Sequence, residues 1–508
     1  MHSLHSAHSA HSAHSAHSTY SPTFRHVATV LAVLAAAACS PPVHVGGVRA
    51  SPQAPSAVWP ASAGARAPFS DDEARRAARG ALVPADIASR LDRLSLTDVV
   101  DLSLGNSPQT RQSWAQARAA SAVYGSARGK FFPSLSADVI GGPSQSISQN
   151  PARVPSERTT TSATLSLQYV LLDFGARGGN MAAAHEALFA ADFTHNATVQ
   201  SVVLQAEGAY FSYQASRGLL EAAQATVATG QANLTAADRR HDVGLATIAD
   251  VLQARTALAQ SQLAAQTAEG NVQAARAQLA FTLGLAANAR FDVAPDTGVA
   301  PVLVLAENVD SLIERSVRDR PDVAAARALA RQSQDLVRAT RSATLPTITL
   351  GANSGRVYSN STALSGQTYA LTFGLNVPIF SGFSREYDLV AARENAAVFA
   401  ARAEQTRLQA IAQVFTSYHA LRTATQRLTT SAELLASALQ SEEVARGRYS
   451  EGVGSILDLL TAQGALADAR AQSVQSRWTW YATLAQLSRD AGVLGTRGEP
   501  NLSLTAKP

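Results

Sequence analysis

The chain has 508 residues, a formal net charge of +4 and only 16% charged residues, whereas an average soluble domain carries about 25%. This composition is unusual for an enzyme, and scattered basic residues with only 6% aromatic residues argue against nucleic-acid binding. No apolar run reaches the roughly 18 residues of a membrane-spanning helix, so the pattern is not that of a helical membrane protein either.

The first 38 residues are predicted to be a low-complexity extension and a signal peptide. The histidine-rich start "MHSLHSAHSAHSAHSAHS" could be a metal-binding tract. We favour the alternative of a low-complexity extension or a wrongly assigned start codon. The apolar stretch 27–38 has the length of a signal-peptide hydrophobic region. Cys39, the only cysteine, follows as in a bacterial lipoprotein signal, so we expect export and lipid attachment there. Cleavage at an Ala-x-Ala site, with Cys39 incidental, is the alternative.

Most of the remaining chain consists of two copies of one plan. The segment "SLTDVVDLSLGNSPQTRQSWAQA" from Ser95 matches "NVDSLIERSVRDRPDVAAARA" from Asn308. Further pairs follow in the same order: "FFPSLS" with "TLPTIT", "LLDFGAR" with "IFSGFSR", and "RHDVGLATIADVLQA" with "RYSEGVGSILDLLTA". A sustained internal repeat indicates duplicated structural units. We predict repeats over 95–290 and 308–490, a linker with an equatorial segment over 39–94, and a tail over 491–508.

Each copy is predicted to start with a helix, 109–130 in the first, and to continue into two strands. The runs 134–139 and 162–170 alternate apolar and polar residues, as do 348–352 and 369–377 in the second copy. Period-two alternation predicts strands with one apolar and one polar face. The polar segments between the strands, 141–160 and 354–367, are expected to be loops.

A long helical hairpin is predicted next in each copy. No proline occurs between Pro155 and Pro295, and residues 182–241 suit one helix of about 90 Å at 1.5 Å per residue. Small apolar residues at short spacing favour a coiled-coil hairpin over a globular core. Gly244 and Gly452 are expected to end the incoming helices, because glycine readily adopts the left-handed conformation.

The four predicted strands have apolar faces that suit lipid, but a bilayer requires every backbone polar group to be paired. An open four-stranded sheet therefore cannot lie in a membrane, and closure requires several chains. Three chains would give a twelve-stranded antiparallel barrel, an even number as in known outer-membrane barrels. The long helices would continue its lumen as a tube.

These motifs, together with "DRPDV" at 319–323, resemble those of the TolC-type outer-membrane factors over about 95–490. The resemblance implies an α+β membrane protein of two tandem helix–strand–strand–hairpin repeats, forming a homotrimeric barrel in outer-membrane lipid and a periplasmic helical tunnel. It implies an exit duct of a tripartite efflux system, working with a periplasmic adaptor protein and an inner-membrane transporter. The alternative is the outer-membrane channel of a type I protein secretion system. Cys39 resembles the lipid attachment site of the lipidated efflux branch.

The resemblance also implies a periplasmic gate formed by the two hairpin tips. Asp458 takes the position of an aspartate ring that favours cations. The alternative is that Asp458, and at least in part Asp250, is a helix N-terminal residue favoured by the helix dipole. Asp250 and Tyr449 keep the positions of two tip-closing residues. Gly454 stands where a closing arginine is expected, and Thr461 where a second acidic residue is expected. The closure is therefore either looser or apolar, through Leu457 and Leu460.

An enzyme and a surface coiled-coil or adhesin protein are the rival interpretations. The histidines beyond the signal region are scattered, and no nucleophile elbow, phosphate loop or metal-ligand cluster is present. We therefore expect no catalytic activity, no cofactor and no metal site. An adhesin would account for the long helices but not for strands with lipid-compatible faces.

Overall fold

The computed structural model describes residue 89 and residues 91–147, 155–295, 303–305, 308–360, 365–494 and 504–506. All of these residues belong to one compact unit, Arg79–Pro508. The predicted extension, the signal peptide and Cys39 lie outside the described residues. None of the helices in these ranges combines the length and the hydropathy that a helix needs to cross a membrane.

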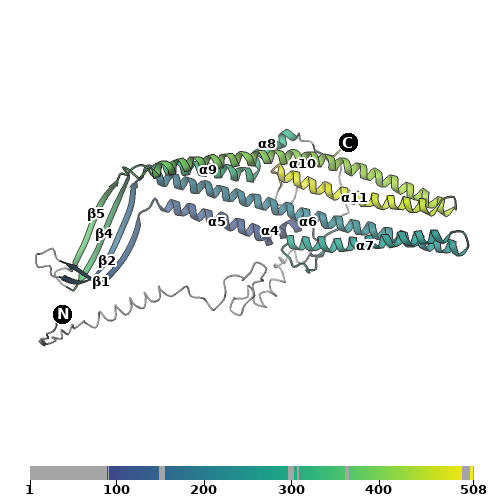
Figure 1. Ribbon diagram of the computed structural model, residues 1–508, viewed down its shortest axis with the longest axis horizontal. Coiled ribbons are helices and arrows are strands. Elements are labelled where there is room, and N and C mark those ends of the chain that lie inside the picture. Colours follow the sequence, from purple (N-terminus) through teal and green to yellow (C-terminus); the bar gives the residue numbers. More distant parts are fainter. Residues whose placement is uncertain are drawn as a thin grey trace, which may run out of the picture. The chain divides into compact units, whose positions relative to one another are not determined.

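The elements follow the same order in two halves (Figure 1). The first half contains η2 (Leu91–Arg93), α4 (Leu96–Asn106), α5 (Pro108–Gly129), β1 (Ser134–Ile147), β2 (Pro155–Leu172), α6 (Ala176–Asp242), α7 (Ile248–Thr282) and β3 (Leu303–Leu305). The second half contains α8 (Val309–Asp319), α9 (Pro321–Ser342), β4 (Thr347–Ser359), β5 (Gly366–Asn376), α10 (Ser384–Ser450), α11 (Ile456–Asp490) and β6 (Leu504–Ala506). Corresponding helices have equal lengths of 11, 22, 67 and 35 residues.

The long helix α6 begins at Ala176, earlier than the expected residue 182, because the preceding turn caps it. Asp173 Oδ2 accepts hydrogen bonds from the backbone N–H of Arg177 at 2.8 Å and from its Nε at 2.9 Å. An acidic side chain at this position satisfies N–H groups that the first helical turn leaves unpaired. The sequence "LLDFGAR" is thus a strand-to-helix connection, as its place in the repeat suggested.

The four long strands form one antiparallel sheet in the order β1-β2-β4-β5. Its ladders run beyond the predicted strands, to Ile147 opposite Pro155 and to Val357 opposite Gly366. The prediction of loops over 141–160 and 354–367 was therefore wrong at both ends of each segment. An antiparallel ladder pairs backbone groups whatever the side chains, and Pro143 is tolerated because β1 is an edge strand of this sheet.

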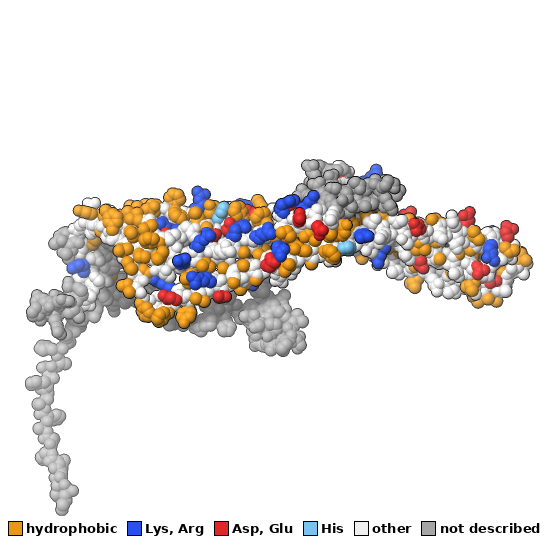
Figure 2. All heavy atoms as spheres, turned by 90° about the horizontal axis from the view of Figure 1, so that it is seen from above, with side chains coloured by type: hydrophobic (Ala, Val, Ile, Leu, Met, Phe, Trp, Pro, Cys, Tyr) orange, Lys and Arg blue, Asp and Glu red, His pale blue; other side chains and the backbone are white. Residues whose placement is uncertain are grey.

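The register gives this sheet one apolar and one polar face, which confirms the faces that the alternation predicted. One row across all four strands is apolar and the adjacent row is mainly polar: Leu135, Leu167, Ala352 and Leu371, then Ser136, Ser166, Asn353 and Ala370. Phe373 on the apolar face is 71% exposed in the single chain. Figure 2 shows hydrophobic side chains gathered at the end of the unit that carries the sheet. Among the described residues, this face therefore has no cover.

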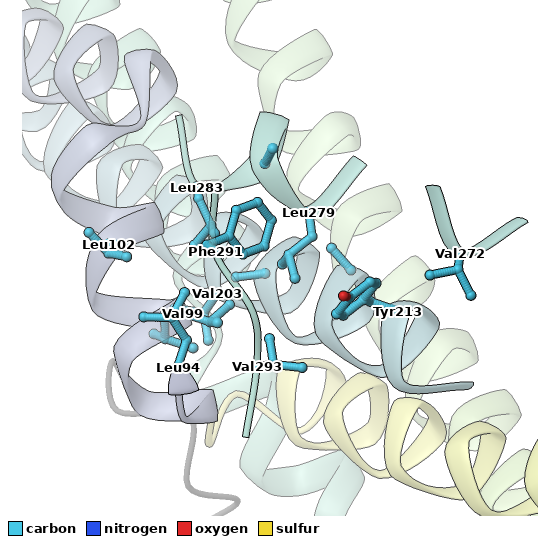
Figure 3. Close-up of a cluster of buried hydrophobic side chains, with 14 of the residues drawn as sticks. Leu94, Val99, Leu102, Val203, Tyr213, Val272, Leu279, Leu283, Phe291 and Val293 are labelled. Carbon is cyan, nitrogen blue, oxygen red and sulfur yellow. The ribbon is translucent and has the colours of Figure 1, made fainter. Parts of the chain in front are cut away.

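The described helices have two larger cores, two thin seams and a smaller cluster of Phe211, Ala215, Trp478 and Ala485 between α6 and α11. One core joins the α4 region to α6 and α7 around Val99, Val203 and Leu279 (Figure 3). The other joins α8, α10 and α11 around Leu312 and Trp480. Nearer the turns, the seams between paired long helices consist of small clusters, Ala237 with Val251 and Ala254, and Ala438 with Leu466 and Ala469. Small side chains let paired helices approach closely, as predicted for a coiled-coil hairpin.

Candidate functional site

Two turns of the same geometry join the paired long helices, at the end away from the sheet (Figure 1). Gly244 and Gly452 both have a φ of +77°, a conformation that strongly favours glycine. The N–H of the following residue donates to the carbonyl oxygen of Arg240 in one turn, at 2.7 Å, and of Arg448 in the other, at 2.9 Å. The two glycines therefore end their helices as the sequence predicted.

Asp250 and Asp458 each cap the helix that leaves a turn. Asp250 accepts a hydrogen bond from the Thr247 N–H at 2.8 Å, and the Thr247 hydroxyl accepts one from the Asp250 N–H at 3.3 Å. Asp458 and Ser455 form the same reciprocal pair at 3.2 and 3.1 Å. The hydrogen bonds from Ser455 lower the pKa of Asp458. Both carboxylates therefore lie in the first turns of their helices, as the helix N-terminal interpretation expected. The gate role of Asp458 stays a prediction.

Arg240 links the two hairpins close to the turns. Its Nη1 donates to the backbone carbonyl oxygen of Tyr449 in α10 at 2.8 Å, and its guanidinium carbon lies 4.8 Å from the centre of the Tyr449 ring. The cation is therefore held both by a hydrogen bond and by the face of an aromatic ring. Sequence reasoning missed this contact, although an arginine opens both copies of the turn motif, as Arg240 and Arg448.

Asp250 acts electrostatically on Tyr449, the other predicted tip-closing residue. Burial raises the pKa of Tyr449, while the charge of Arg240 lowers it and that of Asp250 raises it. The Tyr449 hydroxyl is buried and has no hydrogen-bond partner among the described residues. A Cβ atom added at Gly454 would lie 3.0 Å from Cβ of Arg448, so a larger side chain there would require the turn to shift.

A polar network, also missed at the sequence level, connects the hairpins farther from the turns. Asn233 in α6 contacts Gln463 in α11, and Gln463 Nε2 donates to Glu442 Oε1 in α10 at 3.3 Å. Glu442 also pairs with Arg446 and is only 2% exposed. Burial alone would raise the pKa of Glu442, but the hydrogen bonds from Arg446 and Gln463 outweigh burial and lower it.

A cavity of about 490 Å³ lies between the hairpins beside this network. Its walls come from α6, α7, α10 and α11 and include the polar Asn233 and Glu442. The small side chains of Thr226 and Ala471 also line it. The seam between the two hairpins is therefore incompletely filled within one chain.

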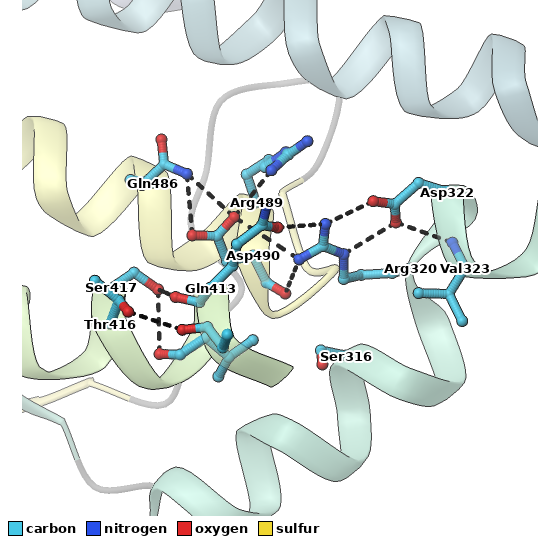
Figure 4. A network of polar contacts seen from close by, with 12 residues as sticks. Ser316, Arg320, Asp322, Val323, Gln413, Thr416, Ser417, Gln486, Arg489 and Asp490 are labelled. Atoms are coloured by element: carbon cyan, nitrogen blue, oxygen red, sulfur yellow. Dashed lines mark hydrogen bonds and ion pairs between the residues drawn. The ribbon is translucent and has the colours of Figure 1, made fainter. Parts of the chain in front are cut away.

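The "DRPDV" segment forms a buried ionic cluster where α9 begins (Figure 4). Arg320, 3% exposed, contacts Asp322 through Nε at 3.0 Å and Nη2 at 2.6 Å. It also donates to Gln413 Oε1 at 2.8 Å and to the carbonyl oxygen of Asp490 at 3.3 Å. One side chain thus connects the start of α9 with α10 and with the end of α11, a structural role for this motif.

The described residues contain no group of three or more His, Cys, Asp and Glu side chains placed to hold a metal ion. His195 Nδ1 lies 2.8 Å from the Ser113 hydroxyl, and His241 Nδ1 lies 3.0 Å from the Ala246 carbonyl oxygen. His185 and His419 lie beside Phe189 and Phe415 respectively. These histidines therefore occupy separate places along the helices.

The chain matches the family model described as "Outer membrane efflux protein" over residues 99–285 and 312–493. It is 30% identical over 390 residues to "Protein CyaE" of Bordetella pertussis, covering 76% of this chain and 81% of the relative. It is 26% identical over 425 residues to "Probable efflux pump outer membrane protein TtgC" of Pseudomonas putida, covering 80% of this chain and 87% of the relative.

Solved structures share the fold. The outer-membrane channel OprN matches with a TM-score of 0.72 and 18% identity, over 82% of this chain and 97% of that one. The open state of the Neisseria gonorrhoeae MtrE outer membrane channel matches with a TM-score of 0.68 and 19% identity, over 82% of this chain and 94% of that one. The two ranges of the family match fall in the two halves described above.

Proposed function

The chain belongs to the outer membrane efflux protein family and is an outer-membrane exit duct, and we propose that three copies of it close into one twelve-stranded barrel. The observation that carries this proposal is the sheet β1-β2-β4-β5 with its uncovered apolar face. Within the described part of the chain, β1 and β5 are the edges of that sheet. In lipid, backbone groups at both edges require partners, which β5 of one copy and β1 of the next would supply.

The polar face of the closed barrel would line a water-filled lumen. Helices α6, α7, α10 and α11 would continue this lumen into the periplasm, since α6 and α10 each have 67 residues and reach about 100 Å at 1.5 Å per residue. Their matched lengths support an origin of the two halves by internal duplication. The two turns would form the periplasmic end of the tunnel, where Asp458 of three copies would attract cations.

The partners in this proposal are a periplasmic adaptor protein and an inner-membrane transporter, with Cys39 as the lipid attachment site. Relatives named as efflux pump outer membrane proteins favour efflux over the alternative of type I protein secretion. The chain itself would act as a conduit without catalysis.

Two measurements on the purified full chain test the assembly. Native mass spectrometry in detergent should give three copies per particle, and planar bilayers should then show a cation-selective pore. A folded monomer or dimer would contradict the trimeric barrel. The recordings are then repeated at a denaturant concentration that is low enough to loosen only the hairpin tips. A trimer that still forms no pore would contradict the continuous lumen.

A further inference from the structure

The connection from β2 to α6 lies where the sheet meets the helices (Figure 1). It turns at Phe174 and Gly175, and the ends of α5 and α9 flank this turn. On one side, Arg177 Nη1 donates to the Lys130 carbonyl oxygen at 3.4 Å. On the other side, the Ser342 hydroxyl donates to the Phe174 carbonyl oxygen at 3.0 Å. The turn and the two helix ends therefore form one continuous surface within a single chain.

Phe174 holds a backbone conformation that a bulky residue rarely adopts. Its φ is +50°, in the left-handed region, where the Cβ atom crowds the backbone. The side chain is nevertheless 49% exposed, so packing inside the chain does not account for the conformation. The matching connection in the second half has the same features, with Phe383 at a φ of +64° and 62% exposed. A costly conformation that exposes an aromatic ring in both halves indicates a function for that ring.

The helix ends beside this turn carry unpaired positive charge. No acidic residue occurs in segments 102–137 or 336–385, which contain the ends of α5 and α9. Arg128, Lys130 and Arg341 are exposed there, and none of the three forms an ion pair within the described part of the chain. Asp173 and Asp335 on neighbouring segments are paired with other arginines, at 2.9 and 2.7 Å. The surface therefore attracts anions.

Exposed apolar side chains continue from this surface onto the sheet. Phe132, between α5 and β1, is 71% exposed, and Leu135 and Val139 on the apolar face of β1 are 65% and 74% exposed. At a membrane boundary, aromatic rings lie at the level of the headgroups and cations attract anionic lipid. The sequence of apolar sheet, aromatic rings and cations thus matches a lipid molecule from its acyl chains to its headgroup.

We infer that Lys130 and Arg341 bind the phosphate of an anionic phospholipid on either side of the Phe174 ring. This inference rests on the proposed position of the sheet in lipid, and it adds a preference among lipids. A zwitterionic headgroup carries a cation of its own, which the unpaired Lys130 and Arg341 repel, whereas an anionic headgroup keeps a net negative charge. The Phe174 ring packs against the upper part of the acyl chains and is removed from water there.

Native mass spectrometry of the full chain in a neutral detergent tests the inference by counting the lipids that stay bound. The probes are phosphatidylglycerol and phosphatidylcholine with identical acyl chains. The unchanged chain should retain phosphatidylglycerol preferentially, and Lys130→Gln with Arg341→Gln should reduce this preference by about fivefold per charge. The matched control is Arg422→Gln with Arg427→Gln, two exposed arginines far along α10, which should keep the preference. A preference that both double variants keep, or that both lose equally, overturns the inference.

Phe174→Gly separates lipid binding from folding. Glycine adopts the left-handed conformation without strain, so the unfolding midpoint in detergent should stay equal or rise. Fewer lipids of both kinds should remain bound, because the ring no longer contacts the acyl chains. Unchanged lipid retention overturns the contact assigned to this ring.

The number of copies per particle in the same spectra separates this inference from the proposed assembly. Particles of three copies without a lipid preference overturn the headgroup surface and leave the barrel standing. Particles of one copy that retain phosphatidylglycerol selectively support the headgroup surface, which lies within one chain, and overturn the barrel.

Discussion

Arg320 at the start of α9 and Asp490 at the end of α11 meet in the interior of the second half, and the side chain of each is only 3% exposed. Arg320 Nη1 donates to the Asp490 carbonyl oxygen at 3.3 Å. A buried guanidinium is tolerated only when its donors are satisfied. Asp322, Gln413 and Asp490 together supply these acceptors.

Arg320→Ala should therefore destabilise the fold strongly, because it removes the buried partner of Asp322 and the donor to Gln413 and to the Asp490 carbonyl oxygen. The Asp490 carboxylate keeps its contacts with Arg489 and Gln486. Breaking a buried pair costs about 3–5 kcal/mol, and we expect a matching fall in the free energy of unfolding in a urea titration. Arg318→Ala is the control, since its pair with Asp319 is largely exposed and should contribute little to stability. Equal losses in the two variants would contradict the structural role of "DRPDV".

Arg240→Ala should loosen the hairpin tips without unfolding the chain. It removes the hydrogen bond to the Tyr449 carbonyl and the stacking on its ring, together worth about 1–3 kcal/mol. Hydrogen exchange of the backbone amides around 449–455 should become faster, while amides of the core around Val203 stay unchanged. Tyr449→Phe is the control: the Tyr449 hydroxyl has no hydrogen-bond partner in the described part of the chain, so exchange should not accelerate. Faster exchange in Tyr449→Phe would point to an unrecognised hydroxyl contact.

Asp458→Asn should separate the charge of this residue from its capping role. An asparagine oxygen accepts the same N-cap hydrogen bond, whereas the negative charge is lost. If three Asp458 carboxylates line the constriction, the cation selectivity of the pore in planar bilayers should fall while the thermal stability of the protein changes little. Asp250→Asn gives the comparison at the other turn. Unchanged selectivity in Asp458→Asn would leave capping as the whole function of this residue.

Glu207 should make stability depend on pH. Burial raises its pKa from 4.5 to about 7, and Oε2 has no hydrogen-bond partner among the described residues. Between these values the folded chain keeps a proton that the unfolded chain has released, so stability should fall as pH rises through this range. Glu207→Gln should remove the fall and add up to roughly 3 kcal/mol above pH 7.

Urea midpoints measured from pH 5 to pH 8 provide the check on Glu207. Glu433→Gln, an exposed glutamate of α10, serves as the control and should leave the pH profile as it is in the unchanged chain. A Glu207→Gln profile parallel to that of the unchanged chain would mean that this carboxyl is paired in the assembled protein.

The sequence alone was sufficient to predict the features that depend on local residue patterns. Alternation over 134–139 and 369–377 gave both faces of the sheet, because side chains of a strand point to opposite sides in turn. Gly244 and Gly452, each followed by an aspartate, predicted both turns, because these residue types satisfy local backbone requirements at helix ends. The absence of proline predicted the long helices. Helix α6 nevertheless begins at Ala176 and not at the expected residue 182, because Asp173 caps it.

The contacts between distant segments required the tertiary structure. The sequence does not indicate that β2 pairs with β4, that Leu303–Leu305 pairs with Leu504–Ala506, or that Arg240 bonds a carbonyl oxygen of α10. Every residue has the same backbone carbonyl group, so the sequence does not show which carbonyl oxygen accepts such a hydrogen bond. Glu442 belongs to the run "SEEVARGR" at 441–448, a charge pattern typical of a solvated helix face. It is nevertheless buried, because the packing of α10 against α11 removes it from water.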